Sequence, residues 1–163
     1  KVFTTSFVKS NKVAKRSESQ SITIIENYFK AALKHKVACT ITICINKEVF
    51  NKVGGFDEQL NRGEDLDLWS RIGREYRFIK SILITAIYVL EAENRSDVAF
   101  NMTKSRIYNY DFMESKSKAE TRYYKNQIIS TMRKLIRKGK VDQFWKLKQK
   151  HRKHISFIEI IRY

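Results

Sequence analysis

The stretch GGFDEQLNRGEDLDLWSRI, residues 54–72, combines a glycine pair with three closely spaced carboxylates. The carboxylates belong to Glu64, Asp65 and Asp67, and an apolar helical pattern follows at once. A carboxylate on an apolar surface can act as a general base, because partial desolvation favours proton uptake while the N–H groups of a helix start keep the group ionised. This stretch is therefore the first candidate for chemistry in the chain.

A helix predicted over 63–76 distinguishes the three acids. With Leu66 at 0° and a step of about 100° per residue, the apolar residues occupy an arc from about 200° to about 300°. Asp65 falls inside this arc, whereas Glu64 lies at its margin and Asp67 lies outside it. Two interpretations of Asp65 remain open. It is either an acid that binds free N–H groups of the first turn, worth about 0.3 to 1 kcal/mol, or a general base at the floor of a cleft.

The connection before this helix is rich in glycine. Gly54 and Gly55 allow a sharp turn, and Phe56 is expected to fill the core beneath it. Residues 57–63 then form a polar connection that delivers the start of the helix to a defined place. Ordinary turn chemistry accounts for the same glycines, so this pattern alone does not establish a site.

The surrounding patterns predict an α/β arrangement in the first hundred residues. The expected elements are a helix over 22–36, a buried strand over 37–45, a helix over 47–53 with Asn46 as N-cap and Gly54 at its end, and one or two buried strands over 78–90. Cys39 and Cys44 would point to opposite faces of their strand. We therefore expect no disulfide between them, but buried reduced thiols as in a cytoplasmic protein.

From about residue 101 the pattern is helical and basic. Residues 104–163 hold 17 Lys and Arg against 5 Asp and Glu, in a chain of net charge +16. We predict one helix whose apolar stripe is followed by Gly139, and a last helix over 142–160. The stripe is Tyr124, Ile128, Met132, Leu135 and Ile136, and the anchors of the last helix are Phe144, Trp145, Leu147, Ile155 and Ile158. The chain thus divides into 1–100 and a basic helical extension, 101–163.

The basic segment 133–154 interleaves aromatic residues with Lys and Arg, and three interpretations remain open. It is a solvated face of packed helices, a surface that docks on an anionic membrane, or a nucleic-acid interface. His151 and His154 have a spacing that suits a metal ion. The surrounding positive charge argues against a cation there, and we expect none.

Length and composition limit the remaining choices. A chain of 163 residues suggests one domain or a piece of a larger one. No apolar run approaches the roughly 20 residues that span a bilayer. The N-terminus, KVFTTSFVKS, has neither a signal peptide nor Met, which suggests a part of a longer chain.

Three consecutive segments carry a family resemblance: a strand, the stretch NKEVFNKVGGFDEQLNRGEDLDLWSRI, and a buried strand. Their order resembles the C-terminal half of the inverting family-2 glycosyltransferases. These enzymes have the nucleotide-diphospho-sugar transferase fold called GT-A. Nearly every position of the family's motif matches over residues 47–71, and the resemblance covers about residues 35–97. The basic C-terminal helices lie outside it.

The resemblance implies that Asp65 is the catalytic base. It would take the proton of an acceptor hydroxyl, which attacks the anomeric carbon of a nucleotide-linked sugar and inverts its configuration. Glu64 would contact or orient the acceptor, and Trp69 would anchor the helix in the core. The implied acceptor-binding residues are Gly54, Gly55, Asp57, Gly63 and Glu64. The acceptor class is a saccharide or a lipid-linked sugar, as in cell-surface polysaccharide synthesis.

Two departures from the family pattern matter. Family members commonly carry Tyr-Arg-x-His after the second strand, whose His approaches the metal and the diphosphate, whereas residues 88–91 here read Tyr-Val-Leu-Glu. Glu91 is then either a ligand for Mg²⁺ or Mn²⁺ or an ordinary surface residue. The family's nucleotide-binding region and Asp-x-Asp metal motif lie upstream of the acceptor segment. The sole such triplet here is Asp65-Leu66-Asp67.

We therefore expect the C-terminal portion of a longer enzyme, with a partial GT-A fold that lacks the nucleotide-binding half. The intact enzyme would use a nucleotide-sugar and Mn²⁺ or Mg²⁺, neither bound by this portion alone, which would be inactive. The expected location is the cytoplasm, with peripheral contact to the inner face of the membrane through residues 133–154. The alternative is a non-catalytic basic module that binds an anionic membrane or nucleic acid.

Overall fold

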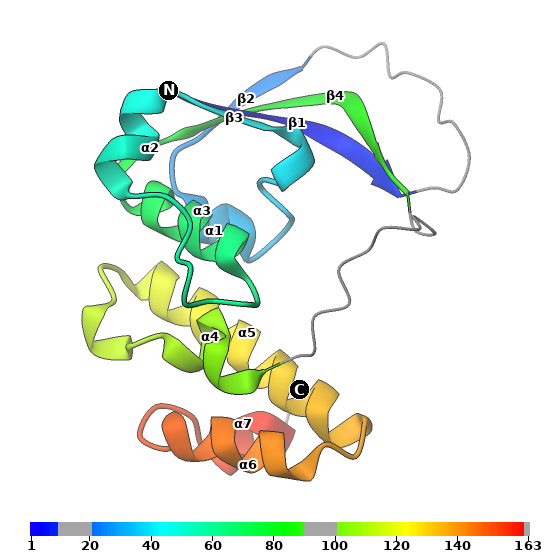
Figure 1. Ribbon diagram of the computed structural model, residues 1–163, viewed down its shortest axis with the longest axis vertical. Coiled ribbons are helices and arrows are strands. Elements are labelled where there is room, and N and C mark those ends of the chain that lie inside the picture. Colours follow the sequence, from blue (N-terminus) through cyan, green and yellow to red (C-terminus); the bar gives the residue numbers. More distant parts are fainter. Residues whose placement is uncertain (10–20, 90–100, 162–163) are drawn as a thin grey trace. The chain divides into compact units, whose positions relative to one another are not determined.

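The computed structural model describes residues 1–9, 21–89 and 101–161 (Figure 1). The chain forms two compact units. The N-terminal unit contains residues 1–57 and 65–99, and the C-terminal unit contains residues 58–64 and 100–163. The segment 58–64, which lies within the glycine-rich stretch, thus groups with the C-terminal helices. The predicted division into 1–100 and 101–163 stays a prediction.

The N-terminal unit is built on a four-stranded mixed sheet. Its strands are β1 (Val2–Lys9), β2 (Ile22–Ile25), β3 (Ile43–Ile45) and β4 (Phe78–Tyr88), in the order β2-β4-β1-β3. β1 and β4 are parallel, and the other two pairs are antiparallel. The predicted α/β class is therefore confirmed for this unit, although the central strand β1 was not among the predicted elements.

The helical elements of this unit are α1 (Tyr28–Ala32), the 3₁₀ turn η1 (Thr40–Thr42), α2 (Lys47–Val53) and α3 (Glu64–Glu75). Figure 1 shows α1 and α3 on the same side of the sheet. The predicted caps of α2 are confirmed. The side chain of Asn46 accepts a hydrogen bond from the Glu48 N–H at 2.7 Å, and Gly54 ends the helix with a φ of 79°.

The prediction of one helix over 22–36 is wrong. Residues 22–25 are all β-branched, and they pair with β4 as an edge strand. The helix begins only after Asn27, whose Oδ1 accepts a hydrogen bond from the Lys30 N–H at 2.9 Å. The pairing with a strand more than fifty positions away decides this segment, and no local pattern contains that information.

The prediction of one buried strand over 37–45 is also wrong, because only Ile43–Ile45 pair with β1. Val37, Ala38 and Cys39 are buried in an irregular segment that leads into η1. Both cysteines are free, as predicted, but Cys44 is exposed and only Cys39 is buried. The first part of the apolar run is therefore buried without forming a strand, and only its last three residues form one.

α3 provides much of the core of this unit. Leu68, Trp69 and Ile72 are fully buried, as the apolar arc predicts. The helix also packs closely on α1, since a Cβ placed on Gly73 would lie 2.5 Å from the Cβ of Tyr28. The predicted strand over 78–90 exists as the single strand β4, but most of its residues are only partly buried.

The C-terminal unit is helical. Its elements are η2 (Met102–Lys104), α4 (Arg106–Asn109), η3 (Phe112–Glu114), α5 (Lys118–Arg137), α6 (Val141–Lys150) and α7 (Phe157–Ile161). The predicted stripe of α5 is buried except for Ile136, which is exposed. Gly139 follows α5 with a φ of 66°. None of the helices in the described ranges is long and apolar enough to cross a membrane.

The prediction of one helix over 142–160 is wrong, because the chain turns at residues 151–156 between α6 and α7. His151 is buried at this turn, and its Nε2 lies 2.8 Å from the Ile107 carbonyl oxygen. The rings of His151 and His154 both pack on Phe112. Of the predicted anchors of this helix, Phe144, Leu147 and Ile155 are buried, whereas Trp145 and Ile158 are exposed.

Candidate functional site

Asp65 lies in the first turn of α3 and is partly buried. Its Oδ1 accepts a hydrogen bond from the backbone N–H of Leu66 at 2.7 Å. Within the described ranges, no Lys or Arg forms an ion pair with this carboxylate. The hydrogen bond to a helix N–H is the contact expected of an N-terminal acid, and it leaves Oδ2 available to accept a proton.

Asp67 differs from Asp65 in its partner. Its Oδ2 forms an ion pair with Arg71 Nε at 2.8 Å, and both side chains are partly buried. The predicted separation of the acids by burial is not observed, since Glu64, Asp65 and Asp67 are all partly buried. What separates Asp65 from Asp67 is charge pairing, because Asp67 already neutralises a neighbouring guanidinium.

Arg71 connects α3 to the glycine pair. Its Nη1 donates to the Val53 and Gly54 carbonyl oxygens at 2.6 and 3.2 Å, and its Nη2 donates to the Gly55 carbonyl oxygen at 2.7 Å. Together with the ion pair to Asp67, these bonds hold the turn after α2 against α3. Sequence reasoning missed this role. The available signal was the spacing of four residues between Asp67 and Arg71, which places them on one helix face.

Side chains are disfavoured at both positions of the glycine pair, by the backbone conformation at Gly54 and by the close ring of Phe50 at Gly55. Gly54 has a φ of 79°, a conformation that favours glycine, and a Cβ there would lie 3.5 Å from Arg71 Nη1. A Cβ on Gly55 would lie 3.3 Å from the ring of Phe50. Phe56, predicted to fill the core, is instead 45% exposed and contacts the ring edges of Phe50 and Trp69.

The rest of the loop belongs to the C-terminal unit. The Asn61 N–H donates to the Lys104 carbonyl oxygen at 2.9 Å, and the Arg106 N–H donates to the Arg62 carbonyl oxygen at 3.0 Å. Gly63 has a φ of 79°, and a Cβ there would lie 3.4 Å from the Cβ of Arg106. The start of α4 thus holds the segment that leads to Glu64.

The predicted site residues therefore fall into two groups, one in each unit. Gly54, Gly55 and the exposed Asp57 belong to the N-terminal unit together with Asp65. Gly63 and Glu64 belong to the C-terminal unit. Glu64 and Asp65 are consecutive in the chain.

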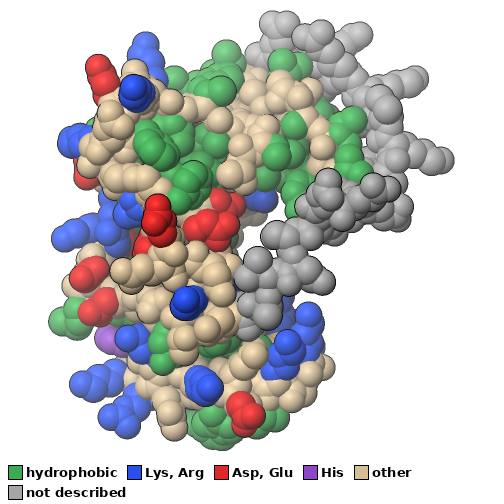
Figure 2. Space-filling model, in the orientation of Figure 1, with side chains coloured by type: hydrophobic (Ala, Val, Ile, Leu, Met, Phe, Trp, Pro, Cys, Tyr) green, Lys and Arg blue, Asp and Glu red, His purple; other side chains and the backbone are tan. Residues whose placement is uncertain are grey.

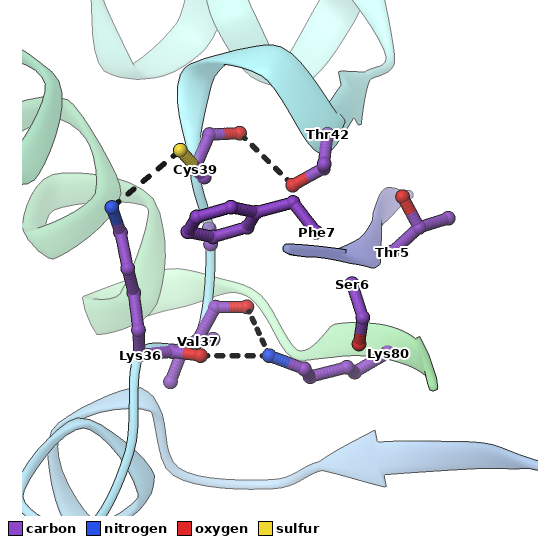
Figure 3. A pocket seen from close by; sticks show the side chains of 9 residues that line it. Thr5, Ser6, Phe7, Lys36, Val37, Cys39, Thr42 and Lys80 are labelled. Atoms are coloured by element: carbon purple, nitrogen blue, oxygen red, sulfur yellow. Dashed lines mark hydrogen bonds between the residues drawn. The ribbon is translucent and has the colours of Figure 1, made fainter. Parts of the chain in front are cut away.

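A polar pocket of about 260 Å³ lies elsewhere in the N-terminal unit and was not predicted from the sequence (Figure 3). It is lined by Thr5, Ser6, Phe7, Lys36, Val37, Ala38, Cys39, Thr42 and Lys80. Lys80 Nζ donates to the Lys36 and Val37 carbonyl oxygens at 2.7 and 3.1 Å. Burial, and then the charge of Lys36, lowers the pKa of Lys80. None of the predicted site residues lines this pocket.

The described residues do not fit a divalent metal ion. Within the described ranges, no group of three His, Cys, Asp or Glu side chains is arranged to hold one. The Asp65-Leu66-Asp67 triplet does not offer two free carboxylates, since Asp67 is paired with Arg71. Glu91, the other candidate ligand, lies outside the described residues. No catalytic step is assigned to a metal at these residues.

Comparison with protein families identifies the class. The chain matches the family described as "Glycosyltransferase like family 2" over residues 8–153, and it therefore belongs to this family. The match extends beyond residues 35–97 on both sides and includes α5 and α6. No curated protein and no solved structure gave a match. The family membership supports a transferase that acts in glycosyl transfer.

Proposed function

We propose that the chain provides the catalytic base and the acceptor wall of an inverting glycosyltransferase. The donor is a nucleotide-sugar, and the acceptor is a saccharide or a lipid-linked sugar. The observation that carries the proposal is the state of Asp65. The Asp65 carboxylate lies in the first turn of α3, accepts a hydrogen bond from the Leu66 N–H and forms no ion pair among the described residues, whereas Asp67 is paired with Arg71.

In the proposed reaction, Asp65 accepts the proton of an acceptor hydroxyl. The acceptor oxygen forms a bond to the anomeric carbon of the donor sugar from the side opposite the nucleotide. The bond from that carbon to the diphosphate oxygen breaks, and the nucleoside diphosphate leaves with the bonding electrons. A single displacement of this kind inverts the anomeric configuration. A positioned general base contributes about 10² to 10⁴ in rate to such a step.

Glycine at positions 54, 55 and 63 would let the acceptor approach the backbone closely, while Asp57 and Glu64 would offer oxygens to its hydroxyl groups. The bonds from Arg71 to the carbonyl oxygens of Gly54 and Gly55 support this role, because they give the turn one conformation. Arg71 is a positioning residue in this scheme, since it acts through the backbone that it holds.

The donor and its Mn²⁺ or Mg²⁺ would be bound by residues outside those described, in a nucleotide-binding half that carries an Asp-x-Asp motif. The pairing of Asp67 with Arg71 supports this assignment. We expect calorimetry of the 163-residue chain with UDP-sugars and Mn²⁺ to show weak binding or none. Micromolar binding would overturn the assignment without affecting the role of Asp65.

The role of Asp65 is tested by Asp65→Asn in the polypeptide that carries this chain together with its nucleotide-binding half. We expect kcat to fall about 10² to 10⁴-fold with little change in KM, because the substitution removes a proton acceptor but keeps the side-chain shape. Glu75→Gln is the matched control. Glu75 lies at the other end of α3 in a surface ion pair with Lys52, and its loss should leave kcat unchanged.

Two results would contradict the proposal. One is an Asp65→Asn enzyme with unchanged kcat. The other is a product whose new glycosidic bond, analysed by proton NMR, keeps the anomeric configuration of the donor. Circular dichroism of both variants separates loss of chemistry from loss of fold. Action on a polysaccharide or glycolipid precursor at the cytoplasmic side of a membrane is part of the same proposal.

A further inference from the structure

The C-terminal unit exposes a cluster of large apolar side chains on α6 and α7. Its members are Val141 (55% exposed), Trp145 (47%), Phe157 (47%), Ile158 (58%) and Ile161 (79%). We call this set the α6–α7 patch. Figure 2 shows hydrophobic side chains over α6 and α7 with Lys and Arg side chains beside them.

The patch is continuous rather than a set of scattered residues. Val141 and Trp145 are one turn apart on α6, and Phe157 and Ile161 are one turn apart on α7. The rings of Trp145 and Phe157 join the two helices, with their centroids 5.7 Å apart. Contiguous exposed apolar surfaces mark interaction sites, whereas single exposed apolar residues are common on protein surfaces.

The patch does not belong to the core of the unit. Each helix already has its own buried contacts, which are made by Phe144 and Leu147 on α6 and by Ile160 on α7. The backbone of α7 is also anchored by Arg133, which donates hydrogen bonds to the Glu159 and Ile160 carbonyl oxygens. The exposed side chains therefore form a second apolar face of each helix.

Exposed positive charge is concentrated at the end of α5, on α6 and in the turn after it, in the same unit as this face. Eight Lys and Arg side chains are exposed between residues 134 and 153, against one exposed acid, Asp142. They are Lys134, Arg137, Lys138, Lys140, Lys146, Lys150, Arg152 and Lys153. Glu159 does not offset them at the surface, since it is paired with Lys125. Lys148 is buried, and its Nζ lies 4.8 Å from the centre of the Phe157 ring.

We propose that the α6–α7 patch docks on an anionic lipid bilayer. The apolar side chains would enter the boundary between headgroups and acyl chains, and the surrounding Lys and Arg would bind lipid phosphates. Interfacial helices combine these two features, with aromatic and aliphatic residues on one face and basic residues beside them. This inference does not depend on the role of Asp65.

The chemistry favours a bilayer over the two other occupants of such a surface. A second copy of the chain would bring the same cations together at close range, and like charges repel. A nucleic acid would be bound by the cations but would leave Ile158 and Ile161 in contact with a charged backbone. Of these three occupants, an anionic lipid surface is the one that satisfies both the charge and the apolar area.

The test is co-sedimentation of the 163-residue chain with vesicles of phosphatidylglycerol and phosphatidylethanolamine, and with vesicles of phosphatidylcholine as the uncharged comparison. Binding to the first and weak binding to the second is expected. The fluorescence of Trp145 reports insertion directly, because the other tryptophan, Trp69, is buried. A shift of emission to shorter wavelength on adding anionic vesicles is expected.

Paired variants separate apolar from electrostatic contributions. Ile158→Ser with Ile161→Ser should reduce partitioning at least tenfold. Met113→Ser, which alters an apolar side chain of η3 that is at least as exposed as either isoleucine, should leave it unchanged. Lys138→Gln with Lys140→Gln should reduce partitioning about fivefold per charge, as a contribution of about 1 kcal/mol per basic residue gives. Lys116→Gln with Lys118→Gln, near the other end of α5, is the charge-matched control.

Each outcome decides the proposal. Loss of binding in the two patch variants, with both controls unaffected, supports it. Binding that survives the isoleucine substitutions with an unchanged Trp145 emission overturns it, since the patch would then not enter the lipid. Absence of vesicle binding overturns it as well, and so does tighter, salt-sensitive binding to duplex DNA or a dimer that the isoleucine variant dissociates.

Discussion

Replacing Arg71 by Ala should destabilise the N-terminal unit by about 2 to 4 kcal/mol. The guanidinium makes three hydrogen bonds to backbone carbonyl oxygens and one charge-paired bond to Asp67. A hydrogen bond to a charged group contributes about 1.5 to 3 kcal/mol, and such terms are not additive. The side chain is 27% exposed, so water replaces part of what is lost.

The assay is urea unfolding followed by tryptophan fluorescence. A Trp145→Phe background leaves Trp69, which lies in α3 beside Arg71, as the single reporter. Arg77→Ala is the matched control, because Arg77 also pairs with a carboxylate, that of Glu26, but both side chains are mostly exposed. Exposed pairs contribute little, so this variant should unfold as the parent does.

Arg71→Lys and Asp67→Asn refine the interpretation. Lys keeps the charge but cannot reach several carbonyl oxygens at once, so it should restore less than half of the lost stability. Asp67→Asn should cost less than Arg71→Ala, because it leaves the bonds to the glycine pair in place. The reasoning is refuted if Arg71→Ala changes the free energy of unfolding by less than about 0.5 kcal/mol, the usual range for a surface substitution.

Two further predictions concern packing and pH. Gly73→Ala should destabilise the chain by about 1 to 3 kcal/mol, the usual effect of overpacking, because the new Cβ would lie 2.5 Å from the Cβ of Tyr28. Ala normally stabilises an exposed helix relative to Gly, so a stabilised variant would contradict this packing. Burial lowers the pKa of His151, so the unfolded chain binds a proton on this ring at a higher pH than the folded chain does. The free energy of unfolding should therefore fall as the pH drops below about 6.5, by at most about 1.4 kcal/mol per pH unit from this group. Denaturant titrations of His151→Asn at several pH values should lack that part of the slope, and an unchanged slope would exclude His151 as its source.

The sequence alone was sufficient for elements whose signals are local. Asn46 and Gly54 mark the two ends of α2 through contacts within a few residues. The apolar arc of α3 and most of the stripe of α5 follow from helical spacing, and both are buried as expected. The motif around Asp65 was equally local, and the family match over residues 8–153 confirms the class that it indicated. The catalytic role of Asp65 itself stays a prediction.

Tertiary structure decided the features that depend on distant partners. β2 replaced the start of a predicted helix because β4 supplies its hydrogen bonds. The last predicted helix ended early at His151, which binds the Ile107 carbonyl oxygen 44 positions away. Arg71 became the link to the glycine pair only when α2 and α3 came together. Helical periodicity and caps act over a few residues, whereas strand pairing, buried turns and side chain-to-backbone bonds need partners whose positions only the folded chain defines.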